Sequence, residues 1–313
     1  MNDLDRLLAE TMRDAAERAP ADDGLLTTVH RRSDRRHRQR IATTLAGVAA
    51  ALAAGVPAVV ATAVRTPESV APNGAAVRLV AGWTAPVFPY TLPVGAGLKA
   101  PVASMHDGDL IGFFEASEQR HHADTTVTVS STAPAFTGPA AETTVQVRGH
   151  PGTLRTVDVR PAKQFTLVWR ESAGRWITLA TDDTYVKQQV VGLADALTAS
   201  PVPVLPPFRL DLTPGGFVTD TVNESTMNFR AAAGEVRVVL RKHRPLGAVN
   251  MNQTVGSYPA SLTHDGSGVT LDVDVTDWEA TLEVTVGRGV AMSDGDLVRF
   301  AAGIHILNRS NPQ

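Results

Sequence analysis

The most distinct hydrophobic pattern in this chain is an uncharged stretch over residues 41–64. It contains ten alanines, five valines, two leucines and one isoleucine. The hydrocarbon core of a bilayer requires about 20 mostly apolar helical residues. We therefore predict a single transmembrane helix here. Two other interpretations remain open: a signal peptide cleaved after the small residues Ala61-Thr62-Ala63, and a buried helix of a soluble domain.

Within this stretch, Gly47, Ala51 and Gly55 recur at intervals of four residues. Small residues at this spacing let two membrane helices approach closely. A homodimer through this face is therefore possible, although an alanine-rich sequence also produces the spacing by chance.

Residues 1–40 form a short tail before the predicted span. Leucines at positions 4, 7 and 8, with Met12 and Ala15, follow a helical period that ends before Pro20. This pattern predicts an amphipathic helix over residues 3–19. One such helix cannot fold alone, so its apolar stripe needs a cytoplasmic protein, the membrane surface or a second copy. The alternative is a loosely ordered tail.

Beyond the span, the pattern changes to short runs with alternating apolar and polar residues. Examples are residues 126–129, 166–169 and 271–275, and this period of two predicts antiparallel strands. Residues 65–77 are rich in turn-forming residues and indicate a linker. Amphipathic helices of about 12–15 residues are predicted after Asp183-Thr184 and after Ser293, where Asp296 completes a capping pattern.

The strand region also repeats itself weakly, which predicts two repeats over residues 78–200 and 201–313. The proline-rich residues 200–207 would form the joint between them. The matched segments are 88–92 with 208–212, 147–154 with 255–262, 165–169 with 269–273, 176–180 with 282–286, and 190–197 with 297–304.

Together these patterns predict the α+β class: an N-terminal amphipathic helix, one transmembrane helix and two tandem antiparallel β-meander-plus-helix repeats. Two such units side by side would give one curved sheet. This arrangement resembles the lipoprotein-carrier-like half-barrels of envelope proteins, although no motif ties the chain to them.

Charge sets the expected orientation of the chain. Residues 30–40 carry six arginines and one aspartate, directly before the apolar stretch. Because arginine and lysine mark the cytoplasmic end of a span, the tail is expected inside and the C-terminal domain outside the cell membrane. This position against the bilayer explains the basic run, and no aromatic residue lies within it, so we expect no nucleic-acid partner.

The layout resembles that of anti-sigma-factor-like bitopic membrane proteins of actinobacteria. The resemblance is carried by Leu4-Asp5-Arg6-Leu7-Leu8, by the arginines at 31–40 and by the Ala/Val-rich span. It implies a regulatory protein whose tail binds a sigma factor. The zinc-containing members carry a His-x3-Cys-x2-Cys motif, and this chain has no cysteine. That difference puts sigma-factor binding in doubt.

Candidate chemistry is sparse. His106, His121 and His122 with Asp107, Asp109 and Asp124 form the one His/carboxylate group in the sequence, but their spacing matches no metal motif, so we interpret them as loop residues. Asp272 and Asp274 share one face of a predicted strand, either as a paired-carboxylate site or, as we favour, as part of the hydrated side of a sheet. We assign no catalytic residue, metal or cofactor.

The sequence thus predicts a single-pass membrane protein with an exterior binding or sensory domain and a partner-binding tail, and not an enzyme. One alternative is a structural module of the cell envelope with an inert anchor. Another is an exported enzyme whose site the sequence does not reveal.

Overall fold

The computed structural model describes residues 76–313, except 94, 119–120, 160–161 and 245–250. The predicted tail, with its helix over 3–19, lies outside the described residues. So do the predicted span, its Gly47, Ala51 and Gly55 face, and all but the end of the 65–77 linker. Within the described part of the chain, neither α-helix has the length and apolar character that a bilayer crossing requires.

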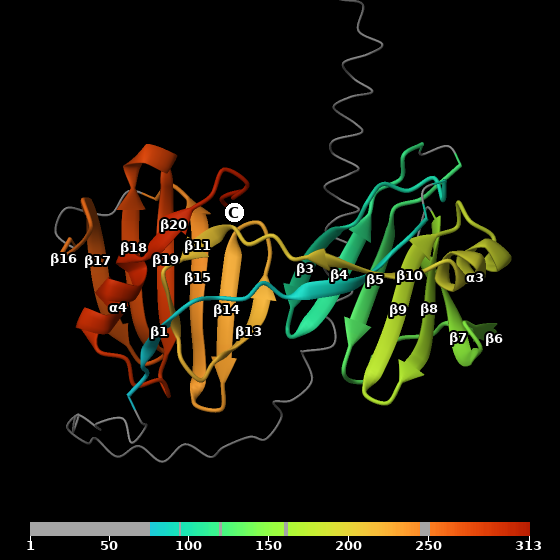
Figure 1. The fold of residues 1–313 in the computed structure, drawn as a ribbon, viewed down its shortest axis with the longest axis horizontal. Coiled ribbons are helices and arrows are strands. Elements are labelled where there is room, and N and C mark those ends of the chain that lie inside the picture. Colours follow the sequence, from blue (N-terminus) through green and yellow to red (C-terminus); the bar gives the residue numbers. More distant parts are fainter. Residues whose placement is uncertain (1–75, 94, 119–120, 160–161, 245–250) are drawn as a thin grey trace, which may run out of the picture. The chain divides into compact units, whose positions relative to one another are not determined.

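The described residues form mainly antiparallel β-structure (Figure 1). Fourteen strands join in one sheet, in the order β16-β17-β18-β19-β15-β14-β13-β3-β4-β5-β9-β8-β7-β6. Its first half contains β3 (Val102–His106), β4 (Asp109–Phe114), β5 (Thr125–Ser130), β6 (Ala141–Val147), β7 (His150–Val159), β8 (Ala162–Ser172) and β9 (Arg175–Asp182). Its second half contains β13 (Val218–Val222), β14 (Thr226–Ala231), β15 (Gly234–Lys242), β16 (Gln253–Val255), β17 (Tyr258–Asp265), β18 (Gly268–Val275) and β19 (Ala280–Gly287).

The two halves have the same topology. Read outward from the middle of the sheet, the first runs β3-β4-β5-β9-β8-β7-β6 and the second β13-β14-β15-β19-β18-β17-β16. They meet where Met105 of β3 pairs with Val222 of β13. The backbone N–H of Gly108 also donates to the carbonyl of Asp220 at 2.8 Å.

Each half has one helix and one two-stranded ribbon outside the sheet. In the first half these are α3 (Lys187–Asp195) and the pair β2 (Val87–Thr91) with β10 (Thr198–Pro203). In the second they are α4 (Asp294–Ala302) and the pair β11 (Phe208–Leu210) with β20 (Ile304–Ile306). A further short pair joins β1 (Leu79–Ala81) to β12 (Leu212–Pro214), and a 3₁₀ turn, η3, covers Thr276–Trp278.

The apolar face of the sheet forms the core. In the second half, Leu240 pairs with Leu282 and Val238 with Val284, and all four side chains are buried. In the first half, Leu167 pairs with Leu179 in the same way. Successive side chains of a strand point to opposite faces of the sheet. The residues directly before and after each buried residue therefore lie on the opposite face.

The predicted α+β class is wrong. The described residues are mostly strand, and the two α-helices have nine residues each. Both are shorter than the expected length of about 12–15 residues. In the first, the Asp182 carboxylate accepts from the Thr184 N–H at 2.9 Å, which favours a turn there, and α3 begins only at Lys187. The β-rich character that we predicted for the exterior part is confirmed.

Strand β10 covers residues 198–203, so the predicted joint over 200–207 begins within a strand, whose register shift between Ala199 and Val202 accommodates its prolines. The N-terminal strand β1, which falls in the predicted first repeat, pairs with β12 next to the second half. The α4 cap is as predicted, because Ser293 Oγ accepts from the Asp296 N–H at 3.1 Å.

Gly112 shows how closely a ribbon packs on the sheet. A Cβ at this position of β4 would lie 2.4 Å from the ring of Phe88, which is fully buried on β2. We predict that Gly112→Ala lowers the free energy of unfolding by about 1–3 kcal/mol through overpacking. Gly192→Ala, in the exposed face of α3 with no atom near its Cβ, should instead raise it by about 0.5–1 kcal/mol. Denaturant unfolding of the full-length chain, followed by tryptophan fluorescence, measures both. Equal effects of the two substitutions would contradict the packing described.

Candidate functional site

A group of charged side chains lies on the second half of the sheet, on the face opposite the apolar core. Arg241 of β15 pairs with Thr281 of β19, directly beside the buried Leu240–Leu282 pair. Asp272 of β18 pairs with Glu283 of β19. Strand alternation therefore puts these charged residues together on the polar face.

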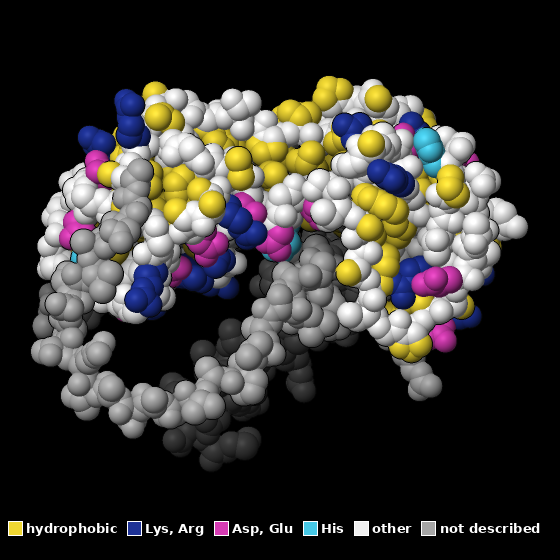
Figure 2. Space-filling view, turned by 90° about the horizontal axis from the view of Figure 1, so that it is seen from below, with side chains coloured by type: hydrophobic (Ala, Val, Ile, Leu, Met, Phe, Trp, Pro, Cys, Tyr) yellow, Lys and Arg dark blue, Asp and Glu magenta, His cyan; other side chains and the backbone are white. Residues whose placement is uncertain are grey.

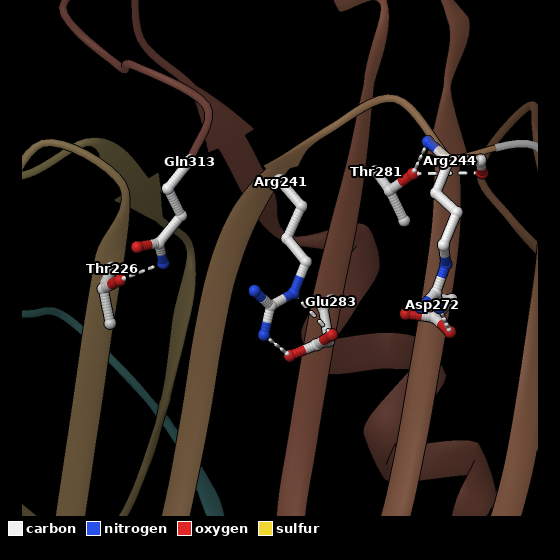
Figure 3. Close-up of polar contacts among 7 residues, drawn as sticks. All are labelled: Thr226, Arg241, Arg244, Asp272, Thr281, Glu283 and Gln313. Carbon is white, nitrogen blue, oxygen red and sulfur yellow. Dashed lines mark hydrogen bonds and ion pairs between the residues drawn. The ribbon is translucent and has the colours of Figure 1, made fainter.

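Arg241 and Glu283 form the best-defined contact of this group (Figure 3). Nε of Arg241 donates to Oε2 of Glu283 and its Nη2 donates to Oε1, both at 2.7 Å. Such a two-point contact fixes the plane of the guanidinium. Hydrogen bonds from Arg241 lower the pKa of the Glu283 carboxyl, and the same contact raises the pKa of Arg241.

The residues that follow β15 extend the group. Nη2 of Arg244 donates to Oδ2 of Asp272 at 2.9 Å, and Nε2 of His243 lies 3.2 Å from Oδ1 of Asp274. A hydrogen bond to β19 holds this segment in place: the backbone N–H of Arg244 donates to Oγ1 of Thr281 at 3.1 Å.

A further ion pair lies on the neighbouring strands, towards the middle of the sheet. Nη2 of Arg230 on β14 lies 3.1 Å from Oδ2 of the buried Asp220 on β13. The same nitrogen lies 3.5 Å from Oδ1 of Asp107, in the β3–β4 turn of the first half. Asn228 of β14 also donates to Oδ2 of Asp220 at 3.2 Å.

In each of these contacts except Arg230–Asp107, the acid is much less exposed than the base. Side-chain exposure is 16% for Glu283 against 39% for Arg241, and 14% for Asp272 against 63% for Arg244. The acids thus support positive groups that point outward. We call this surface the cationic face; it comprises Arg230, Arg237, Arg241, His243 and Arg244. Figure 2 shows basic and acidic side chains side by side on the second half.

The supporting acids are not fully satisfied. Oδ1 of Asp272 and Oδ1 of Asp274 are buried and have no hydrogen-bond partner. The His243 contact brings its ring close to Asp274 without hydrogen-bond geometry. Burial is the largest influence on Asp272 and raises the pKa of its carboxyl, in spite of the nearby Arg244.

The six residues of the predicted His/carboxylate group lie in two places. His106, Asp107 and Asp109 surround the β3–β4 turn, with Nε2 of His106 3.3 Å from Oδ2 of Asp107. The other three precede β5, whose first residue pairs with the last residue of β4, so they lie at the opposite end of that strand. There Oδ1 of Asp124 accepts from the Ala116 N–H at 2.9 Å. The structure does not bring the six together.

Asp272 and Asp274 lie on the polar side of the sheet, but their side chains are only 14% and 13% exposed, so they are less hydrated than we expected. Sequence reasoning missed their partners, Arg244 and His243, and also the neighbouring Arg241–Glu283 pair. The available signal was the spacing of Arg237 and Arg241, which are four residues apart and therefore lie on one face of a strand whose intervening residues are apolar.

No protein-family model and no curated protein matches the chain. A solved structure titled "Crystal structure of MucB in complex with MucA(peri)" matches with a TM-score of 0.21 and 14% sequence identity, over 65% of this chain and 91% of that one. At this TM-score the match supports no conclusion about fold or function.

The two acids that contact Arg241 and Arg244 should respond to pH in opposite ways. The pKa of Glu283 is lowered on folding, so its contribution to stability is present above its ordinary pKa of 4.5 and is lost as the pH falls below that value. We predict that Glu283→Gln lowers the free energy of unfolding by about 1 kcal/mol at neutral pH, because Arg241 is partly exposed and the pair is screened by solvent. The difference should shrink in acid.

Asp272→Asn serves as the internal comparison. Its pKa is raised on folding, so ionisation of Asp272 weakens the folded state as the pH rises from 3.8 through the folded pKa. Relative to the wild type, Asp272→Asn should therefore gain stability with rising pH. Denaturant unfolding between acid and neutral pH measures both variants. Parallel pH profiles for the two would refute these opposite roles.

Proposed function

We propose that this chain is a membrane-anchored binding protein whose exterior domain binds an anionic component of the cell envelope through the cationic face. In this proposal residues 41–64 anchor the chain, the tail is cytoplasmic, and residues 3–19 bind a cytoplasmic partner. The protein would then connect an event outside the membrane to one inside it, as the layout resemblance to anti-sigma-factor-like proteins also suggests.

The arrangement of Arg241 and Arg244 carries the proposal. An exposed arginine normally loses side-chain freedom when it binds an anion. Here Glu283 and Asp272 already hold the two guanidinium groups in place, so part of that cost is met before a ligand arrives. Guanidinium groups match phosphate and carboxylate geometry well, which makes a phosphate-bearing polymer the favoured ligand class.

Binding of a linear polyphosphate chain by the full-length protein in zwitterionic nanodiscs tests the exterior half of the proposal. The double variant Arg241→Gln with Arg244→Gln should weaken binding about tenfold or more, since each lost ion contact contributes on the order of 1 kcal/mol. Fluorescence anisotropy of labelled polyphosphate provides the measurement, and added salt should reduce the affinity of the wild type.

The matched control is Arg170→Gln with Arg175→Gln, two exposed arginines of the first half. It removes the same charge from a surface outside the cationic face. If both double variants lose affinity equally, binding depends only on net charge and the cationic face is not the site. If neither loses affinity, or the wild type does not bind, the anion-binding function is refuted.

The tail is tested separately. Changing Leu7 and Leu8 to Asp should abolish co-purification of a specific cytoplasmic partner, because burying two leucines in a groove contributes about 3–6 kcal/mol. Polyphosphate binding should remain intact in this variant. If the wild-type tail recovers no specific protein, or the variant recovers the same one, the tail is an inert anchor and the structural alternative is favoured.

A further inference from the structure

The fourteen-stranded sheet ends in two edge strands of very different length. At one end, β16 has three residues. At the other end, β6 has seven residues, Ala141–Val147, with no proline and no break in its pairing with β7. Proteins usually shorten, bend or charge their edge strands to prevent pairing with other chains. Strand β6 has one charged residue, Glu142, and is otherwise regular.

The hairpin between β6 and β7 determines which backbone groups of β6 face outward. Its two turn residues, Arg148 and Gly149, have φ angles of 53° and 79°, as a two-residue turn of this kind requires. Val147 and His150 close the turn as a hydrogen-bonded pair. Because such pairs alternate along an antiparallel ladder, residues 145, 143 and 141 also bond to β7. The N–H and C=O groups of residues 142, 144 and 146 therefore point away from the sheet.

No described residue covers these outward groups with a backbone hydrogen bond. Glu142, Thr144 and Gln146 are exposed, and none of their backbone groups bonds to another part of the described chain outside the β6–β7 ladder. Helix α3 lies next to β6, where Nζ of Lys187 contacts Oγ1 of Thr143. Thr143 is one of the residues whose backbone bonds to β7. This contact therefore leaves the backbone groups of residues 142, 144 and 146 free within the described chain.

We propose that β6 is a dimerisation strand, which pairs antiparallel with β6 of a second copy of this chain. Thr144 is the central residue of the strand. A two-fold axis at Thr144 places Thr144 opposite its own copy and Glu142 opposite Gln146. All three outward residues then form hydrogen-bonded pairs, with about six new backbone hydrogen bonds across the interface.

Charge and side-chain pairing favour this register. The carboxylate of Glu142 faces the amide of Gln146 instead of a second acid, and Thr143 faces Val145. Thr–Thr and β-branched pairs are favourable neighbours across strands. A register centred on Glu142, whose Oε1 lies 3.0 Å from Nε of Arg155, would leave half of the strand unpaired. Pairing with β16 of another copy would use only three residues, and would leave a free β6 on every added copy.

Cysteine cross-linking tests the proposal in the full-length chain, which contains no native cysteine. Directly opposite residues in such a pair have Cα atoms about 5.5 Å apart, within the range of a disulfide. Thr144→Cys should therefore form a covalent dimer in membranes under mild oxidation. Thr254→Cys, an exposed threonine of the other edge strand, is the matched control. We expect the dimer yield at 144 to exceed that at 254 by about tenfold, since only the first pair is held in register.

Two variants without cysteine keep the test independent of disulfide chemistry. Thr144→Pro removes an outward N–H, and Thr144→Lys places two like charges opposite each other. Neither disturbs a β6–β7 hydrogen bond. Both should abolish the dimer fraction that sedimentation velocity measures for the wild type in non-ionic detergent. Equal cross-linking at 144 and 254, an unchanged dimer fraction in both variants, or a Thr144→Cys conjugate with a different protein would overturn the proposal.

Discussion

The alternation of side chains along each strand is the constraint on which the rest of the structure depends. On β15, Leu240 must face the core, so Arg241 must face the other way. The same holds on β19, where Leu282 is buried and Glu283 follows it. Burial of the apolar face thus determines which charged groups meet on the polar face, and it leaves the chain no freedom to separate them without a shift in register.

That constraint explains why the acids and bases of the cationic face differ in exposure. Aspartate and glutamate are short and stay close to the sheet, whereas arginine extends over them into solvent. The resulting layer of carboxylates costs desolvation energy, seen in the raised pKa of Asp272. The arginines above it offset part of that cost and become fixed in return. The first half of the sheet has the same topology, but its corresponding strands β8 and β9 pair Thr166 with Ala180 and Val168 with Thr178. The two halves therefore share a fold and differ in surface chemistry.

Sequence patterns identified strands such as β5, β8 and β18, because a period of two survives in their runs without knowledge of tertiary contacts. They did not identify β10, whose prolines indicated a joint. They also identified the α4 cap, since Ser293 and Asp296 interact within one turn. The start of α3 was missed because the Asp182 side chain binds the Thr184 N–H and holds the chain in a turn. The pairing of β1 with β12 joins residues about 130 positions apart, for which a single sequence carries no local signal. The ion pairs were missed for the same reason: Arg241 and Glu283 meet only through the β15–β19 register.

One measurement distinguishes two explanations of anion binding: positioning of the arginines by Glu283 and Asp272, and simple charge attraction. Glu283→Gln and Asp272→Asn each remove a negative charge, so long-range electrostatics alone would strengthen polyphosphate binding. If these acids instead hold Arg241 and Arg244 in place, each substitution should weaken binding about threefold or more, because the freed guanidinium loses order that binding must restore. Titration of polyphosphate into the two full-length variants at neutral pH decides between them. Weaker binding in both supports positioned arginines, and unchanged or tighter binding contradicts them.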